Sequence, residues 1–200
     1  MNSSLIAPDL PEILEDLWMR LAQATTDPRE PFRLPALCTI DQRGWPTSRT
    51  VVLQRTDSTA RTLECHTDLR SEKVRELERD QRCSWLFHDP RVRLQLRAAG
   101  TIALHQNDDL SESRWHGLGD RGRGLYFAPR APGTPGERPD TNFPDLAADP
   151  SIVARWRERF CVLVCQVEQI DWYHIRPEGH LRARFTWSST GELAMTWLAP

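Results

Sequence analysis

The residues best suited to chemistry in this chain are cationic and polar side chains on segments that read as strands or as a helix start. Lys73 stands beside Ser71 where a helix is predicted to begin, and it is the only lysine among the 26 basic residues. Unpaired backbone N–H groups at a helix start favour an anion, and arginine on a rigid strand suits bidentate recognition of phosphate or carboxylate. Together with these two residues, four strand residues indicate a dianionic small molecule held at a barrel surface: Arg49, Gln95, Arg182 and Arg184.

Simpler explanations exist for each of these residues. Taken singly, each fits a surface side chain, and the turn at Lys73 fits a solvated first helical turn. Other chemistries are poorly supported, since there is no Gly-x-Ser-x-Gly motif for a nucleophile. Asp108 and Asp109 fit a helix N-terminus stabilised by its dipole. The six histidines are scattered without an HExxH motif, so no metal site is expected.

The hydrophobic pattern predicts the elements that position these residues. Residues 91–105 alternate strictly, with Leu94 on an apolar face and Gln95 on a polar one, which predicts a strand with one buried face. The polar face fits either solvent or a ligand groove. About eight strands are expected, at residues 37–40, 45–54, 61–67, 82–88, 91–105, 160–170, 181–187 and 193–198. Helices are expected at residues 9–24, 71–80, 108–117 and 150–159.

The predicted fold class is mainly β, with peripheral helices. Most connections are tight turns, which favours antiparallel neighbours, and no βαβ alternation, GxGxxG or P-loop motif is present. The expected architecture is a closed or partly open antiparallel barrel. The 200 residues suit a single domain, 1–200. Residues 1–33 would form an N-terminal helix and connection, and residues 118–150, rich in Gly, Pro and Arg, would form a long loop that is functional or disordered.

Four segments in order carry a resemblance to a known family. They are Arg-Thr-Val-Val-Leu at 49–53, His-Thr-Asp-Leu-Arg-Ser-Glu-Lys at 66–73, Gln-Leu-Arg-Ala-Ala-Gly at 95–100, and an ending with His-Leu-Arg-Ala-Arg-Phe at 180–185 and Trp-Leu-Ala-Pro at 197–200. They are similar to Arg-x-Val-Leu-Leu, Tyr-Thr-Asn-x-x-Ser-Arg-Lys, Gln-Val-x-x-x-Gly, and Arg-Leu-His-Asp-Arg-Phe with a terminal Arg-Leu-Ala-Pro. From about residue 34 to 200, the chain resembles the pyridoxamine 5′-phosphate oxidase-like, FMN-binding split-barrel flavoproteins.

The resemblance implies FMN as the cofactor, a split barrel as the fold and a homodimer with FMN at the subunit interface. It implies that Arg49, Lys73 and Ser71 hold the FMN phosphate. The backbone of Thr50, Val51 and Val52 would run beside the isoalloxazine ring. Four more cofactor residues are implied: His66, Thr67, Gln95 and, from the second subunit, Arg184. A tryptophan would join Arg184 from that subunit, and it corresponds to Trp172, with Tyr173 as the alternative.

Several positions depart from the family pattern. Glu72 replaces the arginine before Lys73, which makes Arg70 the candidate substitute, and His66 replaces a tyrosine. Gln54 stands where the oxidase has a substrate-holding lysine. The oxidase's Arg-x-His pair is reversed in type at His180 and Arg182. The implied substrate-binding residues are therefore His180, Arg182 and, from the long loop, Arg121.

Composition narrows the partners. The net charge is −2, so no global basic field favours nucleic acid or an anionic membrane. The first residues lack the pattern of a signal peptide, and no apolar run approaches the length of a membrane span. Five cysteines without CxxC spacing indicate a reduced protein of the cytoplasm. No nucleic-acid or membrane partner is expected.

The sequence therefore predicts an FMN-dependent oxidoreductase that acts on an unidentified small substrate. Two alternatives stay open. One is a genuine pyridoxamine or pyridoxine 5′-phosphate oxidase, and the other is a flavin-binding or carrier protein without turnover.

Overall fold

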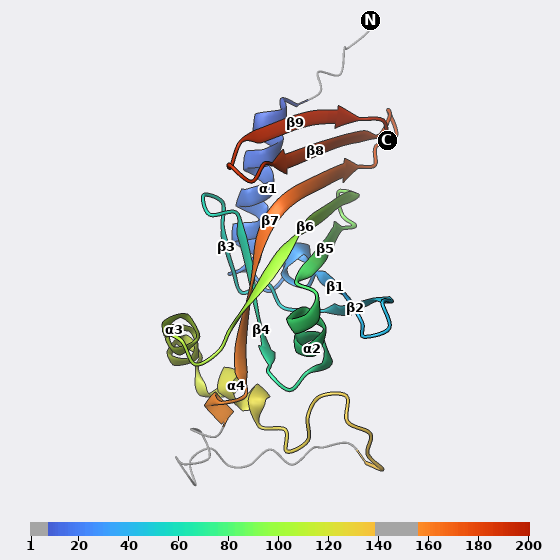
Figure 1. Ribbon diagram of the computed structural model, residues 1–200. Helices are drawn as coiled ribbons and strands as arrows, with labels where there is room; N and C mark the ends of the chain where they lie inside the picture. Colours follow the sequence, from blue (N-terminus) through green and yellow to red (C-terminus); the bar gives the residue numbers. More distant parts are fainter. Residues whose placement is uncertain (1–7, 139–155) are drawn as a thin grey trace, which may run out of the picture.

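A computed structural model of the chain describes residues 8–138 and 156–200. In these residues nine strands form one antiparallel sheet with the order β2-β1-β5-β6-β7-β4-β3, and β8 and β9 continue from β7 (Figure 1). The strands are β1 (Ala36–Ile40), β2 (Pro46–Thr50), β3 (Arg55–Asp57), β4 (Thr62–Asp68), β5 (Arg82–Asp89), β6 (Leu94–His105), β7 (Phe160–His174), β8 (Leu181–Trp187) and β9 (Leu193–Leu198). The mainly antiparallel β class predicted from the sequence is confirmed.

Short helices surround the sheet. They are α1 (Leu10–Ala24), α2 (Glu72–Arg79), α3 (Asp109–Gly117) and α4 (Asp120–Arg123), with 3-10 turns η1 (Pro31–Arg33) and η2 (Gly124–Tyr126). In Figure 1, α3 and α4 lie at one end of the long strands β6 and β7, and β8 and β9 lie at the other. One face of α1 packs on the main core through Ile13, Leu17, Trp18 and Leu21. A smaller aromatic core lies under α3 and η2.

The central strand β7 changes partners along its length. Its first half, Phe160 to Gln166, pairs with β4, its second half, Gln169 to His174, pairs with β8, and β6 runs beside both halves. Between the halves the register shifts at Ala99 and Gly100, where Gly100 pairs with Val167. A Cβ on Gly100 would lie 1.9 Å from the carbonyl oxygen of Gln166, so only glycine fits there. At this irregularity the sheet divides into two branches, one formed by β4 and β3 and the other by β8 and β9.

The register shift also reverses which residues face the core. Before it, Cys161, Leu163 and Cys165 are buried in the main core, whereas after it the core residues are Ile170 and Trp172. A bulge of one residue moves every later side chain to the opposite face. The polar residues Asp171 and Tyr173 are thereby placed on the side away from the main core.

Several predicted elements differ from those observed. The strand expected at 45–54 ends at Thr50, because the next residues cross between two edges of the sheet: the Val51 N–H donates to the Pro35 carbonyl and the Gln54 N–H to the Glu64 carbonyl. The strand expected from residue 91 begins at Leu94, and Arg93 has a left-handed φ of 54°.

The helical predictions also need correction. The cap of α3 is Asp108, whose carboxylate accepts from the Ser111 N–H at 2.8 Å, so the helix begins one residue later than expected, at Asp109. That bond, more than any other contact, lowers the pKa of Asp108 to about 2. The first part of the predicted loop contains α4 and η2. The rest of that loop, and most of the helix expected at 150–159, lie outside the described residues.

Candidate functional site

Three predicted site residues meet where β4 leads into α2. The Lys73 ammonium donates to the Thr67 hydroxyl at 3.0 Å and to the Ser71 hydroxyl at 3.3 Å, and the two hydroxyl oxygens lie 3.2 Å apart. Thr67 and Ser71 are buried, and Ser71 is the residue immediately before α2. We call Thr67, Ser71 and Lys73 the lysine cluster. It joins one cation and two hydroxyl groups to the first N–H groups of a helix, a combination that suits an oxyanion.

Arg49 adds a second positive charge beside this cluster. Burial lowers the pKa of Lys73, and the charge of Arg49 lowers it further. Two cations that repel each other in a partly dry environment are stabilised when an anion binds between them. The electrostatics of the lysine cluster therefore favour a negatively charged group.

The Arg49 side chain is held by a buried acid that was not among the predicted site residues. Its guanidinium pairs with Glu76 on α2 at 2.8 Å and also donates to the hydroxyls of Thr39 and Thr47. Glu76 is 1% exposed, which is rare for a carboxylate unless it is paired. The signal in the sequence was its spacing, because Glu76 follows Lys73 by three residues and so shares its side of the helix. Glu76 fixes the orientation of Arg49 and offsets part of its charge.

The chain that follows Arg49 is partly accessible. Val51 is buried, whereas Thr50 and Val52 are exposed. This alternation leaves a stretch of backbone at the surface next to Arg49, where the isoalloxazine ring is expected from the sequence.

His66 faces the other side of β4 from the lysine cluster. Its Nε2 lies 3.0 Å from Glu64, and Arg114 on α3 binds the same carboxylate at 2.8 Å. The imidazole also meets the ring of Phe160 edge to face at 5.0 Å. Neighbouring residues of a strand point to opposite faces, so the structure separates His66 from Thr67. The polar hollow that His66 helps to line also includes Gln54 and Arg114 and measures about 330 Å³.

Arg70, the expected substitute for the missing family arginine, is engaged elsewhere. It binds Asp68 through two hydrogen bonds of 2.7 and 3.0 Å. It also donates to the carbonyl oxygens of Ala128 and Pro129 at 2.9 and 3.2 Å. Its contacts tie the segment after η2 to the end of β4 and direct the side chain to that segment.

A second cationic site lies on the far half of β7. The Asp171 carboxylate accepts from Arg182 at 3.1 and 3.0 Å, from Arg97 at 3.0 Å and from Arg184 at 3.5 Å. Asp171 is 2% exposed, whereas the three arginine side chains are partly exposed. Burial acts to raise the pKa of Asp171, but the hydrogen bond from Arg182 and the charge of Arg97 outweigh it and lower the pKa overall. We call these four residues the arginine row.

The strand register places Gln95 beside the arginine row. Arg97, Asp171 and Arg184 are direct cross-strand partners on β6, β7 and β8, and the neighbouring line contains Gln95, Tyr173 and Arg182. Residues paired across strands share a face of the sheet. Three residues predicted separately from the sequence, Gln95, Arg182 and Arg184, therefore lie on one polar face.

Trp172 lies on the opposite face. It pairs with Leu96 and Ala183, both fully buried, and its indole ring contacts the rings of His174 and Trp197 at 5.7 and 6.4 Å. At 5% exposure it is a core residue in this chain. The alternative expected from the sequence, Tyr173, shares the face of Arg184.

The remaining two predicted substrate residues lie apart in the chain. His180 is exposed before β8, where its Nδ1 accepts from the Arg176 N–H at 3.2 Å and its ring meets Tyr173 at 5.9 Å. Arg121 is exposed on α4, at the other end of the sheet from β8 (Figure 1). The folded chain therefore brings His180 near the arginine row and does not bring Arg121 there.

The lysine cluster and the arginine row lie beside different ends of β7. Thr67 pairs with Cys161 near the start of β7, and Asp171 lies ten residues further along. At about 3.3 Å per residue, that span corresponds to about 33 Å.

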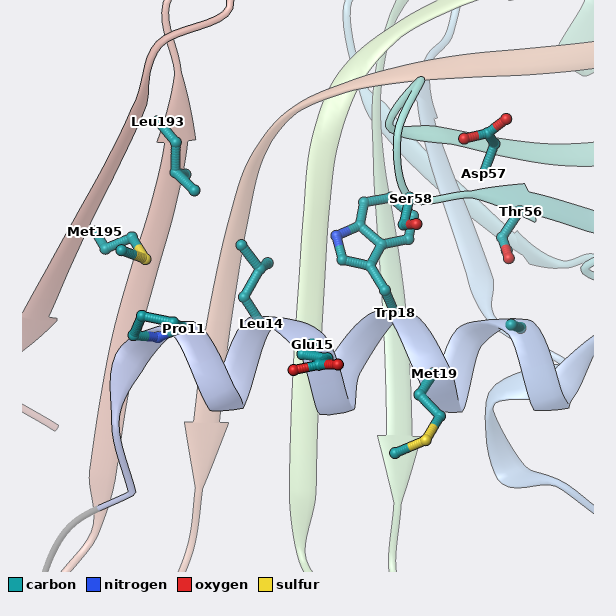
Figure 2. Close-up of a pocket in the computed structure, with 11 residues that line it drawn as sticks. Pro11, Leu14, Glu15, Trp18, Met19, Thr56, Asp57, Ser58, Leu193 and Met195 are labelled. Carbon is teal, nitrogen blue, oxygen red and sulfur yellow. The ribbon is translucent and has the colours of Figure 1, made fainter.

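An apolar groove lies away from both sites. It has a volume of about 720 Å³ and runs between α1, the turn after β3 and β9. Figure 2 shows Leu14 and Trp18 rising from the same side of α1, with Leu14 nearer to Leu193 and Met195 of β9 and Trp18 nearer to Ser58 in the turn after β3. The groove is lined by Pro11, Leu14, Glu15, Trp18, Met19, Ala22, Thr56, Asp57, Ser58, Leu193 and Met195. None of these was a predicted site residue.

Two general features were also tested. Across residues 8–138 and 156–200, no group of three or more potential His, Cys, Asp or Glu ligands is arranged to hold a metal ion. Within the same ranges, no helix has both the length and the hydrophobicity to cross a bilayer.

Comparison with known proteins shows which family the region around these sites resembles. The family model for the FMN-binding domain of pyridoxamine 5′-phosphate oxidase matches residues 15–106, which include Arg49, the lysine cluster and Gln95. Pyridoxine/pyridoxamine 5′-phosphate oxidase 2 of Arabidopsis thaliana is 26% identical over 168 residues, covering 80% of this chain and 82% of that protein.

Solved structures share the fold. A pyridoxamine 5′-phosphate oxidase-related, FMN-binding protein from Nostoc punctiforme superposes with a TM-score of 0.73 at 21% identity, covering 98% of this chain and 100% of that one. PhzG from Burkholderia lata, solved with tetrahydrophenazine-1-carboxylic acid, has a TM-score of 0.67 at 19% identity, covering 98% and 95%. The predicted split-barrel fold is thereby confirmed.

Proposed function

Because the chain belongs to the pyridoxamine 5′-phosphate oxidase-like family of FMN-binding proteins, we propose that it is a homodimeric, FMN-dependent oxidoreductase acting on a small anionic substrate. FMN is the cofactor of the matching family, as expected from the sequence. The observation that carries the proposal is the lysine cluster, where Lys73, Ser71 and Thr67 converge at the start of α2 inside the matched region.

The lysine cluster has the donors that a phosphate monoester needs. Lys73 supplies a charge, Ser71 and Thr67 supply hydroxyls, and the start of α2 supplies backbone N–H groups. Arg49 stands next to them, oriented by Glu76. In the proposal these residues hold the FMN phosphate, while the exposed backbone at Thr50 and Val52 lies beside the ring. The hydroxyl of Thr67 is buried and accepts a hydrogen bond from Lys73, so it also positions the ammonium group.

The proposed dimer follows from the separation of the two sites. The arginine row lies about 33 Å along β7 from the position of the lysine cluster. A second copy that packs on the polar face of β6, β7 and β8 would bring its own Arg184 and Tyr173 to the cofactor of the first. Most homodimers are closed by a twofold axis, which makes such an exchange reciprocal. Each cofactor site would then contain residues from both subunits.

When bound, FMN supplies the centre that accepts a hydride from the substrate. The chain itself binds, orients and shields. Gln95 and Tyr173 offer hydrogen-bonding groups on the polar face, and Arg182, fixed by Asp171, offers a permanent positive charge for an anionic substrate group. His180, next to Tyr173, adds an imidazole that can donate or accept a hydrogen bond.

Oxidation of pyridoxamine or pyridoxine 5′-phosphate is the second candidate activity, and the Arabidopsis thaliana relative favours it. Gln54 argues against it, because an amide supplies no charge where the oxidase has a lysine. Because the oxidase's arginine and histidine are exchanged here, as His180 and Arg182, the permanently charged side chain lies two residues further along the chain than in the oxidase. We therefore propose a different anionic substrate and weak or absent turnover of these vitamin phosphates. A carrier without turnover is the third candidate.

A direct experiment separates these candidates. Protein purified without added cofactor is examined for a flavin spectrum, and FMN-loaded protein is assayed for hydrogen peroxide release with pyridoxamine 5′-phosphate. We expect bound FMN and little release. Turnover at or above about 1 s⁻¹, which is usual for an enzyme on its own substrate, would establish the vitamin phosphate oxidase instead. Protein that does not retain FMN would overturn the proposal.

A further inference from the structure

The arginine row contains more positive charge than its carboxylate can neutralise. Three guanidinium groups surround one carboxylate, which leaves a net charge of about +2 on the polar face of β6, β7 and β8. Each guanidinium has five N–H donors, while a carboxylate accepts about four hydrogen bonds. Four donated bonds already reach Asp171, two of them from Arg182. Most of the donors are therefore available for another acceptor.

Arg97 was not among the predicted site residues, and its position gives it a specific role. It is the cross-strand partner of Asp171 on β6, opposite Arg184 on β8, so the two arginines flank the carboxylate in one line. Its side chain is 46% exposed, compared with 29% for Arg182 and 41% for Arg184. It is the most accessible cation of the row.

We infer that Arg97 is a specificity-determining residue for a substrate group with two negative charges, and that Asp171 is the positioning residue that holds the three arginines ready to bind it. This inference rests on the proposed function, since it assigns the substrate class at that site. A phosphate monoester and a dicarboxylate both carry the required charge. A carboxylate that fixes arginines before the ligand arrives reduces the ordering cost of binding.

Asp171 suits this role because its surroundings hold it in one position. Its carboxylate is buried and its backbone lies in the centre of the sheet, paired to β6 on one side and β8 on the other. Without its charge, three neighbouring guanidinium groups would repel each other and spread into solvent. The row would keep its charge but lose its geometry.

The test uses FMN-loaded protein, so that the cofactor's own phosphate occupies the proposed phosphate site. Calorimetric titrations with inorganic phosphate, malonate and acetate at equal ionic strength compare two dianions with a monoanion. We expect phosphate and malonate to bind more tightly than acetate. Arg97→Gln should weaken dianion binding by about tenfold or more and reduce the selectivity over acetate, as loss of a charge-assisted contact predicts. Arg97→Lys should recover part of it.

Asp171→Asn should weaken dianion binding by a similar factor even though it adds positive charge to the face, and Asp171→Glu should recover part of the selectivity. The matched controls are Arg82→Gln and Asp80→Asn, an exposed pair on β5 and the turn before it that makes the same changes of charge elsewhere. Both controls should leave the titrations unchanged.

The outcomes separate this inference from the proposed function. If FMN is retained but Arg97→Gln binds dianions like the wild type, or if Asp171→Asn binds them more tightly, the inference is wrong and the flavin proposal stands. If FMN is not retained, the flavin proposal is wrong, and the same titrations on the Lys73→Ala protein decide the inference alone. Equal affinity for acetate and malonate would also overturn it.

Discussion

At the Phe160 end of β7, the lysine cluster pairs its cation with hydroxyl groups and the start of a helix. At the His174 end, the arginine row places three cations around a buried carboxylate. The first site has its anionic partner, Glu76, beside Arg49 rather than beside Lys73. The second has Asp171 at its centre. In the described residues, no acid directly contacts Lys73, whereas all three arginines of the row contact Asp171.

This difference suggests two kinds of anion binding. A lysine with a lowered pKa, two hydroxyls and helix N–H groups suits a ligand that stays bound and restores the lysine's charge. An open set of arginines held by one carboxylate keeps its geometry and its charge whether or not a ligand is present. The first arrangement suits a resident cofactor, and the second suits a substrate that comes and goes.

The irregularity at Gly100 keeps the two ends distinct, and its removal is expected to have the largest effect. In Gly100→Ala, the new methyl group would meet the Gln166 carbonyl oxygen at 1.9 Å, which is backbone and cannot rotate away. We expect a loss of about 3 kcal/mol or more in the free energy of unfolding, at the upper end of the cost of overpacking. Denaturant unfolding measures it. Gly44→Ala is the control for a glycine with open space around it, although its φ of 83° makes that change strained as well.

An Ala variant at Gly100 with near-wild-type stability would contradict the view that this close approach fixes the register. In that case the polar face would also need another explanation, since the bulge is what places Asp171 and Tyr173 away from the core.

Much of the lysine cluster could be predicted from the sequence. Thr67, Ser71 and Lys73 lie within seven residues at a strand-to-helix junction, so local structure alone brings them together. The spacing of Glu76 from Lys73 indicates a shared side of α2, but not its burial, because that depends on Arg49, which lies 27 residues away. The contacts of Arg70 could not be predicted for the same reason, since its partners Ala128 and Pro129 come from a distant segment.

The far site depended on information that the sequence does not display. The choice between Trp172 and Tyr173 requires the face of each residue, and the bulge near Gly100 changes that face partway along β7. Strict alternation continued from Cys161 would have placed Asp171 in the core. A glycine on β6 opposite the change from apolar to mixed residues on β7 was the available signal.

Arg49 and Lys73 provide the next largest expected effects, and they should differ in kind. Lys73→Ala should weaken FMN binding by about 1.5–3 kcal/mol, as for a charge-assisted contact, with little loss of stability. Arg49→Ala should also cost about 3 kcal/mol of folding stability, because it leaves the buried Glu76 without its cation. Flavin titration and denaturant unfolding of both variants measure the two quantities.

The double variant Arg49→Ala with Glu76→Gln isolates the two roles of Arg49. Removing the buried charge should recover most of the stability and leave the loss of FMN affinity in place. If Arg49→Ala were as stable as Lys73→Ala, the pairing with Glu76 would be energetically unimportant, and Arg49 would serve the ligand alone.

The smallest expected effect is the pH dependence of the arginine row. The pKa of Asp171 is lower in the folded chain than in the unfolded one, so its ion pairs stabilise the fold above the ordinary Asp pKa of about 3.9 and lose that effect as the pH falls through the lowered value. Asp171→Asn should therefore cost about 1.5 kcal/mol at neutral pH, a typical value for hydrogen bonds to a charged group. The difference between variant and wild type should shrink below about pH 4. Asp80→Asn is the comparison at a more exposed ion pair, where hydrogen bonds with Arg82 lower the pKa of Asp80 to about 2. A difference that stays constant from neutral to acidic pH would mean that Asp171 contributes through packing and neutral hydrogen bonds, and the contrast drawn between the two ends of β7 would lose its electrostatic basis.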